Sequence, residues 1–193
     1  MIGRTLPRGF TLIEVLVTML LLAFGLLGLA SLNTQMQVAE TESYQRAQAV
    51  LLLQDMVDRI STNRANAADY VTGTDAPLGT GDGRADNEDC AALAIGLARD
   101  QCEWSRALKG AAEQKGGGNV GGMIGGRGCV ELIQAADAAA GVCQSGIYRV
   151  SVAWQGLSTL RAPTLACGQD AYGADGLRRV IATEVSIGLP GCI

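Results

Sequence analysis

One carboxylate, that of Glu14, lies inside an apolar stretch that covers residues 10–32. Such a stretch can cross a bilayer as a helix, for which ~20 apolar residues suffice. An unpaired carboxylate in hydrocarbon costs a few kcal/mol or more, so an intramembrane Glu indicates a function. The chemistry open to Glu14 is pairing with a cation that reaches the same depth, where each charge supplies the other's missing partner.

The residues before this stretch carry positive charge only. Arg4 and Arg8 lie in residues 1–9, which contain no acid. By the positive-inside rule these arginines stay in the cytoplasm, so the chain after Leu32 lies on the far side of the membrane. An ordinary signal peptide is the simpler alternative, but it has a shorter apolar core that closes on a small-residue cleavage site. A plain membrane anchor would leave Glu14 unexplained.

Composition argues against most enzymes and against a general nucleic-acid binder. The 193 residues include no histidine, which removes the commonest general base and every histidine-containing metal site. The net charge is −4, and it becomes −6 when Arg4 and Arg8 leave with a cleaved N-terminal segment. A nucleic-acid binder is expected to carry a basic patch, and the pair Arg178–Arg179 alone is too small to be one. We interpret that pair as a solvated strand end, and we expect no cofactor.

A second group of possible ligands lies in a polar loop predicted over residues 72–89. It offers five carboxylate or amide side chains, but their spacing differs from that of an EF-hand calcium loop. We therefore expect a solvated loop there and no metal. The candidate calcium ligands are Asp82, Asp86, Asn87, Glu88 and Asp89.

The elements that position these residues begin with a long helix. Residues 33–64 contain neither Gly nor Pro, and Ala47, Val50, Leu53, Val57 and Ile60 follow at helical spacing. We expect one helix from residue 10 to about residue 62, ~80 Å long. Within it, Gly25 and Gly28 either weaken the helix or allow close packing of small residues.

Residues 8–16, RGFTLIEVL, resemble the class III signal of type IV prepilins. The resemblance implies that a prepilin peptidase cuts between Gly9 and Phe10 and methylates the new N-terminus. It also implies that Glu14 pairs with the N-terminal amine of a neighbouring subunit during assembly. The prepilin would cross the inner membrane once, with its head in the periplasm, and would reach the cell surface in the pilus.

Further blocks resemble the PilV type of type IV pilus minor pilin, also called the type IV pilus modification protein. They lie at residues 43–49, 54–60, 90–104, 128–129 and 148–155. The implied partners are other minor pilins, the major pilin, the prepilin peptidase, the inner-membrane assembly platform and the lipid bilayer. No nucleic acid is expected. A Gly-rich insert at residues 116–128, predicted to be flexible, departs from the pattern.

The remaining chain predicts a small α+β head. Residues 91–108 are predicted to be helical, with Gly96 as a weak point. Residues 148–155 and 181–189 alternate apolar and polar side chains as half-buried strands do, and residues 129–134 are a weaker candidate. The predicted fold is an α+β pilin ladle with about three antiparallel strands packed on the long helix. Its expected parts are a cleaved leader at 1–9, a transmembrane half at 10–32, a periplasmic helix half at 33–64 and a head at 65–193.

Six cysteines in an exported chain predict disulfides, and they allow fifteen full pairings. Chain order favours Cys129–Cys143, which would close a hairpin turn, and Cys167–Cys192, which would fix the C-terminus. Cys90–Cys102 follows by elimination, and it requires a helix that begins late enough for Cys90 to fold back. Otherwise Cys90 and Cys102 stay unpaired or exchange partners with the other four.

Three functions remain open. The leading one is a structural, non-enzymatic minor pilin that helps prime pilus assembly and enters the filament, either at its tip or in its shaft. A minor pseudopilin of type II secretion shares the N-terminal signal but not the later blocks. A displayed adhesion or DNA-binding module belongs to a different class, and the acidic charge argues against its DNA-binding form.

Overall fold

The computed structural model describes residues 9–112, 114–116, 118–119, 121, 123–139 and 142–189. The chain divides into two units, Met1–Thr41 and Glu42–Ile193. The helix α1, Leu12–Thr62, contributes to both of them. Each unit is described by itself.

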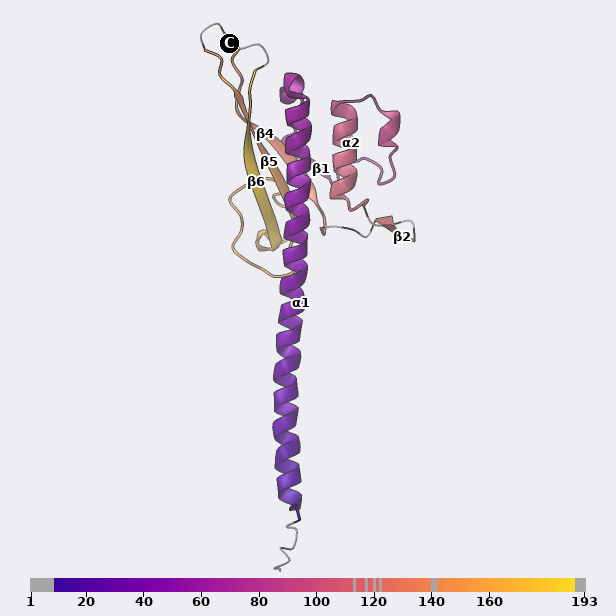
Figure 1. The fold of residues 1–193 in the computed structure, drawn as a ribbon, viewed down its shortest axis with the longest axis vertical. Coiled ribbons are helices and arrows are strands. Elements are labelled where there is room, and N and C mark those ends of the chain that lie inside the picture. Colours follow the sequence, from indigo (N-terminus) through magenta and orange to yellow (C-terminus); the bar gives the residue numbers. More distant parts are fainter. Residues whose placement is uncertain are drawn as a thin grey trace, which may run out of the picture. The chain divides into compact units, whose positions relative to one another are not determined.

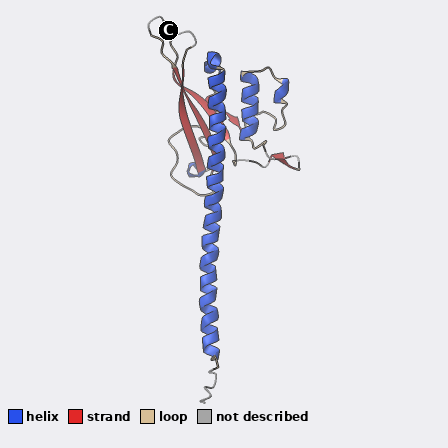
Figure 2. Cartoon of the chain, viewed as in Figure 1, coloured by secondary structure: helices blue, strands red, loops and turns tan. Residues whose placement is uncertain are grey.

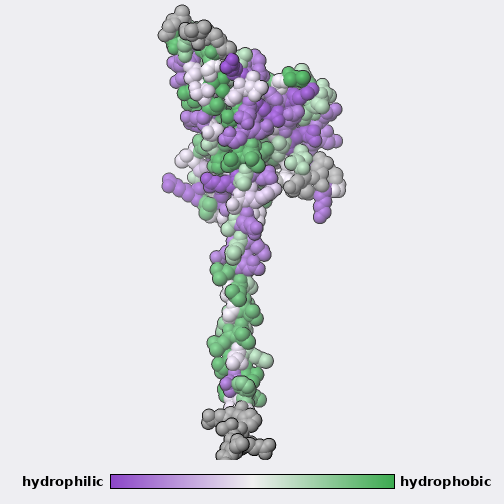
Figure 3. Space-filling view, in the orientation of Figure 1, coloured by the Kyte–Doolittle hydropathy of each residue, from purple (hydrophilic) through white to green (hydrophobic). Residues whose placement is uncertain are grey.

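The described part of the first unit consists of Gly9, Phe10 and Thr11, followed by α1 up to Thr41. Residues 9–37 are all exposed, so this part of α1 has no buried face of its own. Its large apolar side chains are exposed, and they cover most of the helix face that is seen in Figure 3. Ala side chains at Gly25 and Gly28 would meet nothing within 4 Å. A helix that is apolar all round is buried in a membrane or among other chains.

The second unit contains a four-stranded antiparallel sheet in the order β1-β4-β5-β6. Its strands are β1 (Gly73–Gly79), β4 (Arg127–Gln134), β5 (Gly146–Gln155) and β6 (Arg178–Ile187). Three of them were predicted. The fourth, β1, falls where a polar loop was expected, because its sequence GTDAPLG lacks alternation. It is an edge strand with a register shift between Gly73 and Leu78, and an edge tolerates Pro77.

Three short helices and one longer one complete the second unit (Figure 2). The short ones are η1 (Arg64–Tyr70), η2 (Cys90–Ala92) and η3 (Asp175–Leu177). The predicted helix over 91–108 is interrupted: α2 spans only Leu97–Leu108, and Gly96 precedes it with φ of 109°. A two-stranded hairpin of β2 (Gln114–Lys115) and β3 (Gly118–Asn119) lies where the Gly-rich connection was expected to be flexible.

The core lies between the sheet, the second part of α1 and α2. Leu53, Met56 and Ile60 of α1 are buried there with Val150 and Val152 of β5. Trp104 of α2 donates a hydrogen bond from Nε1 to the carbonyl of Leu52, at 2.8 Å. Gly128 makes room for this indole, because a Cβ at that position would lie 2.1 Å from a Trp104 ring carbon.

The buried face of α1 differs from the predicted one. Gln45, Ala49, Leu53, Met56 and Ile60 are buried, whereas Ala47 and Val50 are exposed. Two overlapping apolar rows share Leu53 and Ile60, and both have helical spacing. Packing against the sheet decides which of the two rows is buried. The prediction from periodicity alone is therefore wrong at Ala47 and Val50.

Candidate functional site

Gly9 and Phe10 lie immediately before α1, and Phe10 is 84 % exposed. Thr11 caps the helix: its carbonyl accepts hydrogen bonds from the N–H groups of Glu14 and Val15, at 3.1 and 3.3 Å. Its hydroxyl also accepts from the Glu14 N–H at 3.4 Å. Thr11 is therefore where helix geometry begins, and the Gly9–Phe10 peptide bond lies in chain that precedes the helix.

The Glu14 carboxylate lies in the first turn of α1, where a negative charge suits the helix dipole. Among the described residues, no hydrogen bond or ion pair to this carboxylate is found. Its neighbours one helical turn away, Val17 and Thr18, are exposed as well. The carboxylate is thus surrounded by an apolar helix surface and is available to a cation from outside the chain.

The surface of this part of α1 is largely apolar along its length (Figure 3). A window within this part of α1 is long and apolar enough to cross a bilayer, and none of it is buried inside the protein. The exposed apolar side chains between residues 12 and 32 are Leu12, Ile13, Val15, Leu16, Val17, Met19, Leu20, Leu21, Leu22, Phe24, Leu26, Leu27, Leu29 and Leu32. This unit therefore has the properties of a membrane anchor.

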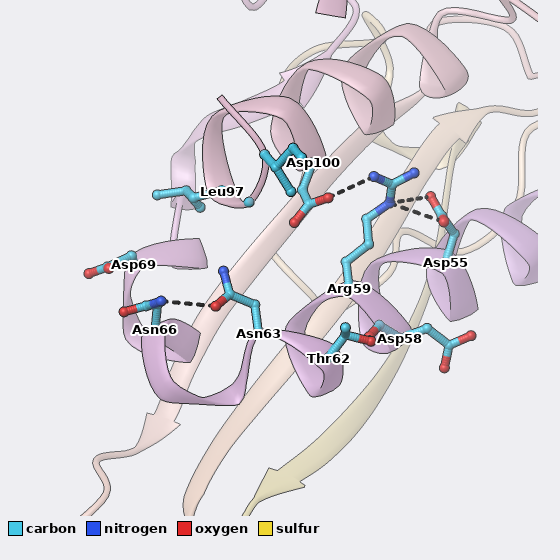
Figure 4. A pocket seen from close by; sticks show the side chains of 11 residues that line it. Asp55, Asp58, Arg59, Thr62, Asn63, Asn66, Asp69, Leu97 and Asp100 are labelled. Atoms are coloured by element: carbon cyan, nitrogen blue, oxygen red, sulfur yellow. Dashed lines mark hydrogen bonds and ion pairs between the residues drawn. The ribbon is translucent and has the colours of Figure 1, made fainter. Parts of the chain in front are cut away.

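In the second unit, a cavity of about 800 Å³ opens where the end of α1 meets η1 and α2 (Figure 4). Its charged residues are mostly acidic, but Arg59 neutralises part of that charge. Arg59 binds Asp55 at 3.0 Å, Asp100 at 3.0 Å and Glu103 at 2.7 Å. Burial disfavours the charged guanidinium, yet these carboxylates more than compensate and raise the pKa of Arg59. The arrangement joins α1 to α2.

Tyr70 extends the same network into the core. Its hydroxyl donates a 2.5 Å hydrogen bond to Asp100 and accepts one of 3.1 Å from the Asn63 amide. Burial, and then the hydrogen bond to Asp100, raise the pKa of Tyr70 to about 12. A tyrosine that stays protonated in this way serves a structural role, as the donor of a hydrogen bond to Asp100. The sequence offered no signal for it, because its partners lie 7 and 30 residues away.

The five calcium candidates are not arranged as a metal site. Within the described parts of the chain, no group of three or more His, Cys, Asp or Glu side chains is arranged to hold a metal ion. Asp82 instead pairs with Lys109 at 2.8 Å, with exposed side-chain fractions of only 5 % and 7 %. The expectation of a solvated loop is therefore wrong at Asp82, although Asp86 is 74 % exposed.

Asp82 closes the loop that follows β1. Its carboxylate accepts hydrogen bonds from the Gly79 and Arg84 N–H groups, both at 3.0 Å, and from the Ser105 hydroxyl at 2.5 Å. Burial by itself would raise the pKa of this carboxyl, but the hydrogen bonds from Lys109, Ser105 and the backbone hold it below its usual value. Asp82 thus attaches α2 to the edge of the sheet and has little capacity left for a cation.

The pair Arg178–Arg179 is not a solvated strand end. The Arg178 side chain is 2 % exposed and binds Asp175 at 2.6 Å. It also donates to the carbonyls of Pro163, Leu165 and Cys167. Arg179 binds Glu42 of α1 at 3.1 Å and the Ser158 carbonyl at 2.8 Å. Both guanidinium groups are engaged within the second unit, and an arginine is buried this deeply only where it is paired.

The disulfides only partly follow the expected pattern. Cys90 is bonded to Cys102, with Cα atoms 5.6 Å apart, and the late start of α2 allows this. Cys129 is bonded to Cys167, not to Cys143, so the predicted Cys129–Cys143 and Cys167–Cys192 bonds are wrong. The former was out of reach because β4 continues for five residues, or ~17 Å, from Cys129 towards the connection that holds Cys143. Cys143 is itself disulfide-bonded, and Cys192 lies outside the described residues.

Comparison with known families matches residues 5–30 to the prokaryotic N-terminal methylation motif. Comparison with curated proteins and with solved structures gave no match. The motif implies processing by a prepilin peptidase and handling by pilus assembly machinery, and it points to a structural subunit. With the apolar helix it supports membrane anchoring. Together with an α+β fold in which a long helix packs on an antiparallel sheet, it supports a type IV pilin-like protein.

Proposed function

We propose that this chain is a minor pilin of the type IV pilus, of the PilV type, that helps prime assembly at the inner membrane and then enters the filament. The carrying observation is the methylation motif over residues 5–30. From Leu12 onwards the motif lies on α1, in the part of this helix whose apolar side chains are exposed among the described residues. The resemblance of residues 43–60, 90–104 and 148–155 to PilV-type pilins supports the finer assignment. The head then lies in the periplasm before assembly and at the cell surface afterwards.

In this proposal Gly9 is the last leader residue and Phe10 is the methylated N-terminus. The exposed chain on either side of this bond suits a peptidase, because it precedes the first hydrogen-bonded turn. Residues 10–32 then cross the bilayer, and the rest of α1, up to Thr62, lies on the periplasmic side. Removal of the leader also creates the α-amine that the next step requires.

Glu14 acts in assembly by pairing with the N-terminal amine of a neighbouring subunit. Both groups are charged, both lie in hydrocarbon, and neither has another partner there. The absence of a partner for Glu14 among the described residues supports this role. The pairing therefore favours the incoming subunit whose N-terminal amine lies at the same depth in the membrane as the Glu14 carboxylate.

A minor pseudopilin of type II secretion is the second candidate, because the methylation motif is shared by both classes. Crosslinking in cells, followed by identification of the bound subunits, separates them by whether pilus or secretion subunits are recovered. A displayed DNA-binding module has less support, because Arg178 and Arg179 bind groups of the head itself.

The test of the assembly role replaces Glu14 in the full chain. Glu14→Ala and Glu14→Gln should keep insertion and cleavage, but incorporation into pili should fall about tenfold or more, since a lost counter-charge is worth a few kcal/mol. Glu40→Ala is the matched control, because Glu40 is an exposed carboxylate of the same helix beyond the apolar stretch. Wild-type incorporation of the Glu14 variants would remove this residue from assembly.

A further inference from the structure

The two edges of the sheet differ in how open they are to another strand. The β1 edge has a register shift, contains Pro77 and begins and ends in glycines with positive φ. The β6 edge has ten residues in unbroken register with β5, and it contains neither Gly nor Pro. Natural sheets protect their edges with irregularities of the first kind. The β6 edge lacks these.

The backbone of β6 presents an open row of hydrogen-bonding groups. Gly156 N–H donates to the Leu177 carbonyl in continuation of the β5–β6 register, so odd-numbered β6 residues turn their backbone groups towards β5. The groups of Val180, Ala182, Glu184 and Ser186 therefore point away from the sheet. Among the described residues, no backbone hydrogen bond outside the β5–β6 ladder is found for the N–H and C=O groups of these four residues.

The side chains along this edge are also incompletely covered. Ile181 and Val185 pack against the core from the edge strand and are only partly buried. On α1, Leu52 and Arg59 contact α2. Val50 and Val57 are each two residues, or about half a helical turn, from Leu52 and Arg59, so they lie on the opposite flank. In Figure 1 β6 lies on the side of α1 away from α2. Val50, on the flank of α1 away from α2, is 44 % exposed.

We infer that the β6 edge receives an extended strand from a different pilin-like subunit, which lengthens the sheet and covers this flank of α1. The strand would carry apolar side chains at alternate positions on the α1 side, beside Ile181 and Val185. On the other face it would meet Ala182, Glu184 and Ser186, all exposed, so polar residues suit that side. Strand addition to an open edge is an established mode of recognition.

A second copy of this chain does not fit as the added strand. Antiparallel pairing of two β6 strands would turn residues 42–62 of the two α1 helices in opposite directions. Prepilins in one membrane share one polarity, a requirement that rests on the proposed function. Parallel pairing about a two-fold axis keeps the polarity, but it places the face with Glu184 beside the partner's Ile181 and Val185.

The test places a photo-crosslinking amino acid at Ser186 in the full chain, expressed in cells of its source. A probe at Asp75, exposed on the β1 edge, is the control. The Ser186 probe should form an adduct with a different chain that carries a prepilin-type N-terminus, and the Asp75 probe should not. No adduct at Ser186, or an adduct only with a second copy, would overturn the inference.

A variant of the edge tests the backbone contact itself. Ala182→Pro removes an outward N–H and leaves the bonds to β5, which an edge strand tolerates. The adduct should fall about tenfold, as expected for one lost hydrogen bond and one unpaired acceptor. Ala182→Ser keeps the N–H and should stay within about twofold, because it leaves the backbone contact intact. An unchanged yield with Ala182→Pro contradicts the inference, and the Ser186–Asp75 comparison stands even if this variant misfolds.

The N-terminal peptide of the same sample separates this inference from the proposed function. If Phe10 is the methylated N-terminus and no adduct forms, the edge inference fails and the pilin assignment stands. If the leader is intact, the pilin assignment fails whatever the crosslinks show.

Discussion

The two units of this chain are stabilised in opposite ways. In the first unit, α1 from Leu12 to Gln37 has only exposed side chains, so this unit depends on lipid or on other subunits. The second unit buries its own core and adds two described disulfides and the buried ion pair between Asp82 and Lys109. The comparison teaches that one polypeptide can combine an apolar segment that needs cover from outside with a domain that buries its own core. Perturbing the second unit should therefore change stability, and perturbing the first should change assembly.

The largest expected effect on the head comes from its longer disulfide loop. Removing Cys129–Cys167, which spans 38 residues, should lower the free energy of unfolding by about 4 kcal/mol in the chain-entropy model. Removing Cys90–Cys102, with a span of 12, should cost about 3 kcal/mol. Denaturant unfolding of the paired Cys→Ala variants measures both. Equal costs, or a larger cost for Cys90–Cys102, would contradict the ranking.

A buried arginine should matter far more than an exposed one. Arg178→Ala leaves Asp175 and three carbonyls without their donor, and the expected loss is about 3 kcal/mol. Arg149→Ala breaks a more exposed pair with Glu184 across neighbouring strands and should cost less than about 1 kcal/mol. Thermal unfolding of the two variants makes the comparison. If both cost the same, Arg178 does not organise the loop that precedes β6.

The smallest effect concerns the pH dependence of the head. The pKa of Tyr70 is raised from about 10 to about 12, so folding favours the protonated phenol. Its contribution is complete below pH 10 and is lost as pH rises through 12. Tyr70→Phe should lower the free energy of unfolding by about 1 kcal/mol at neutral pH. Between pH 10 and 12 the variant should lose less stability with rising pH than the wild type, because it has no phenol to titrate. The check is unfolding of both proteins across that range. An unchanged slope would show that Tyr70 titrates normally in the folded head.

The sequence predicted those elements whose patterns are local. The long helix, β5 and β6 follow from apolar periodicity, and the N-terminal motif follows from nine adjacent residues. It did not predict β1, because an irregular edge strand with Gly and Pro has no alternation. It also missed the Asp82–Lys109 pair, the role of Arg178 and the Cys129–Cys167 bond. All three depend on contacts between residues that are brought together by packing of the whole domain, and no local sequence pattern predicts such contacts.

The measurement that tests the central claim most directly is the mass of the mature N-terminus. Peptide mass spectrometry of protein purified from cells should find Phe10 as the first residue, with one added methyl group. That result would show processing at the bond between Gly9 and Phe10 and would release the amine that the assembly role of Glu14 requires. An intact leader in assembled material, or cleavage near Ala30, would contradict the pilin assignment.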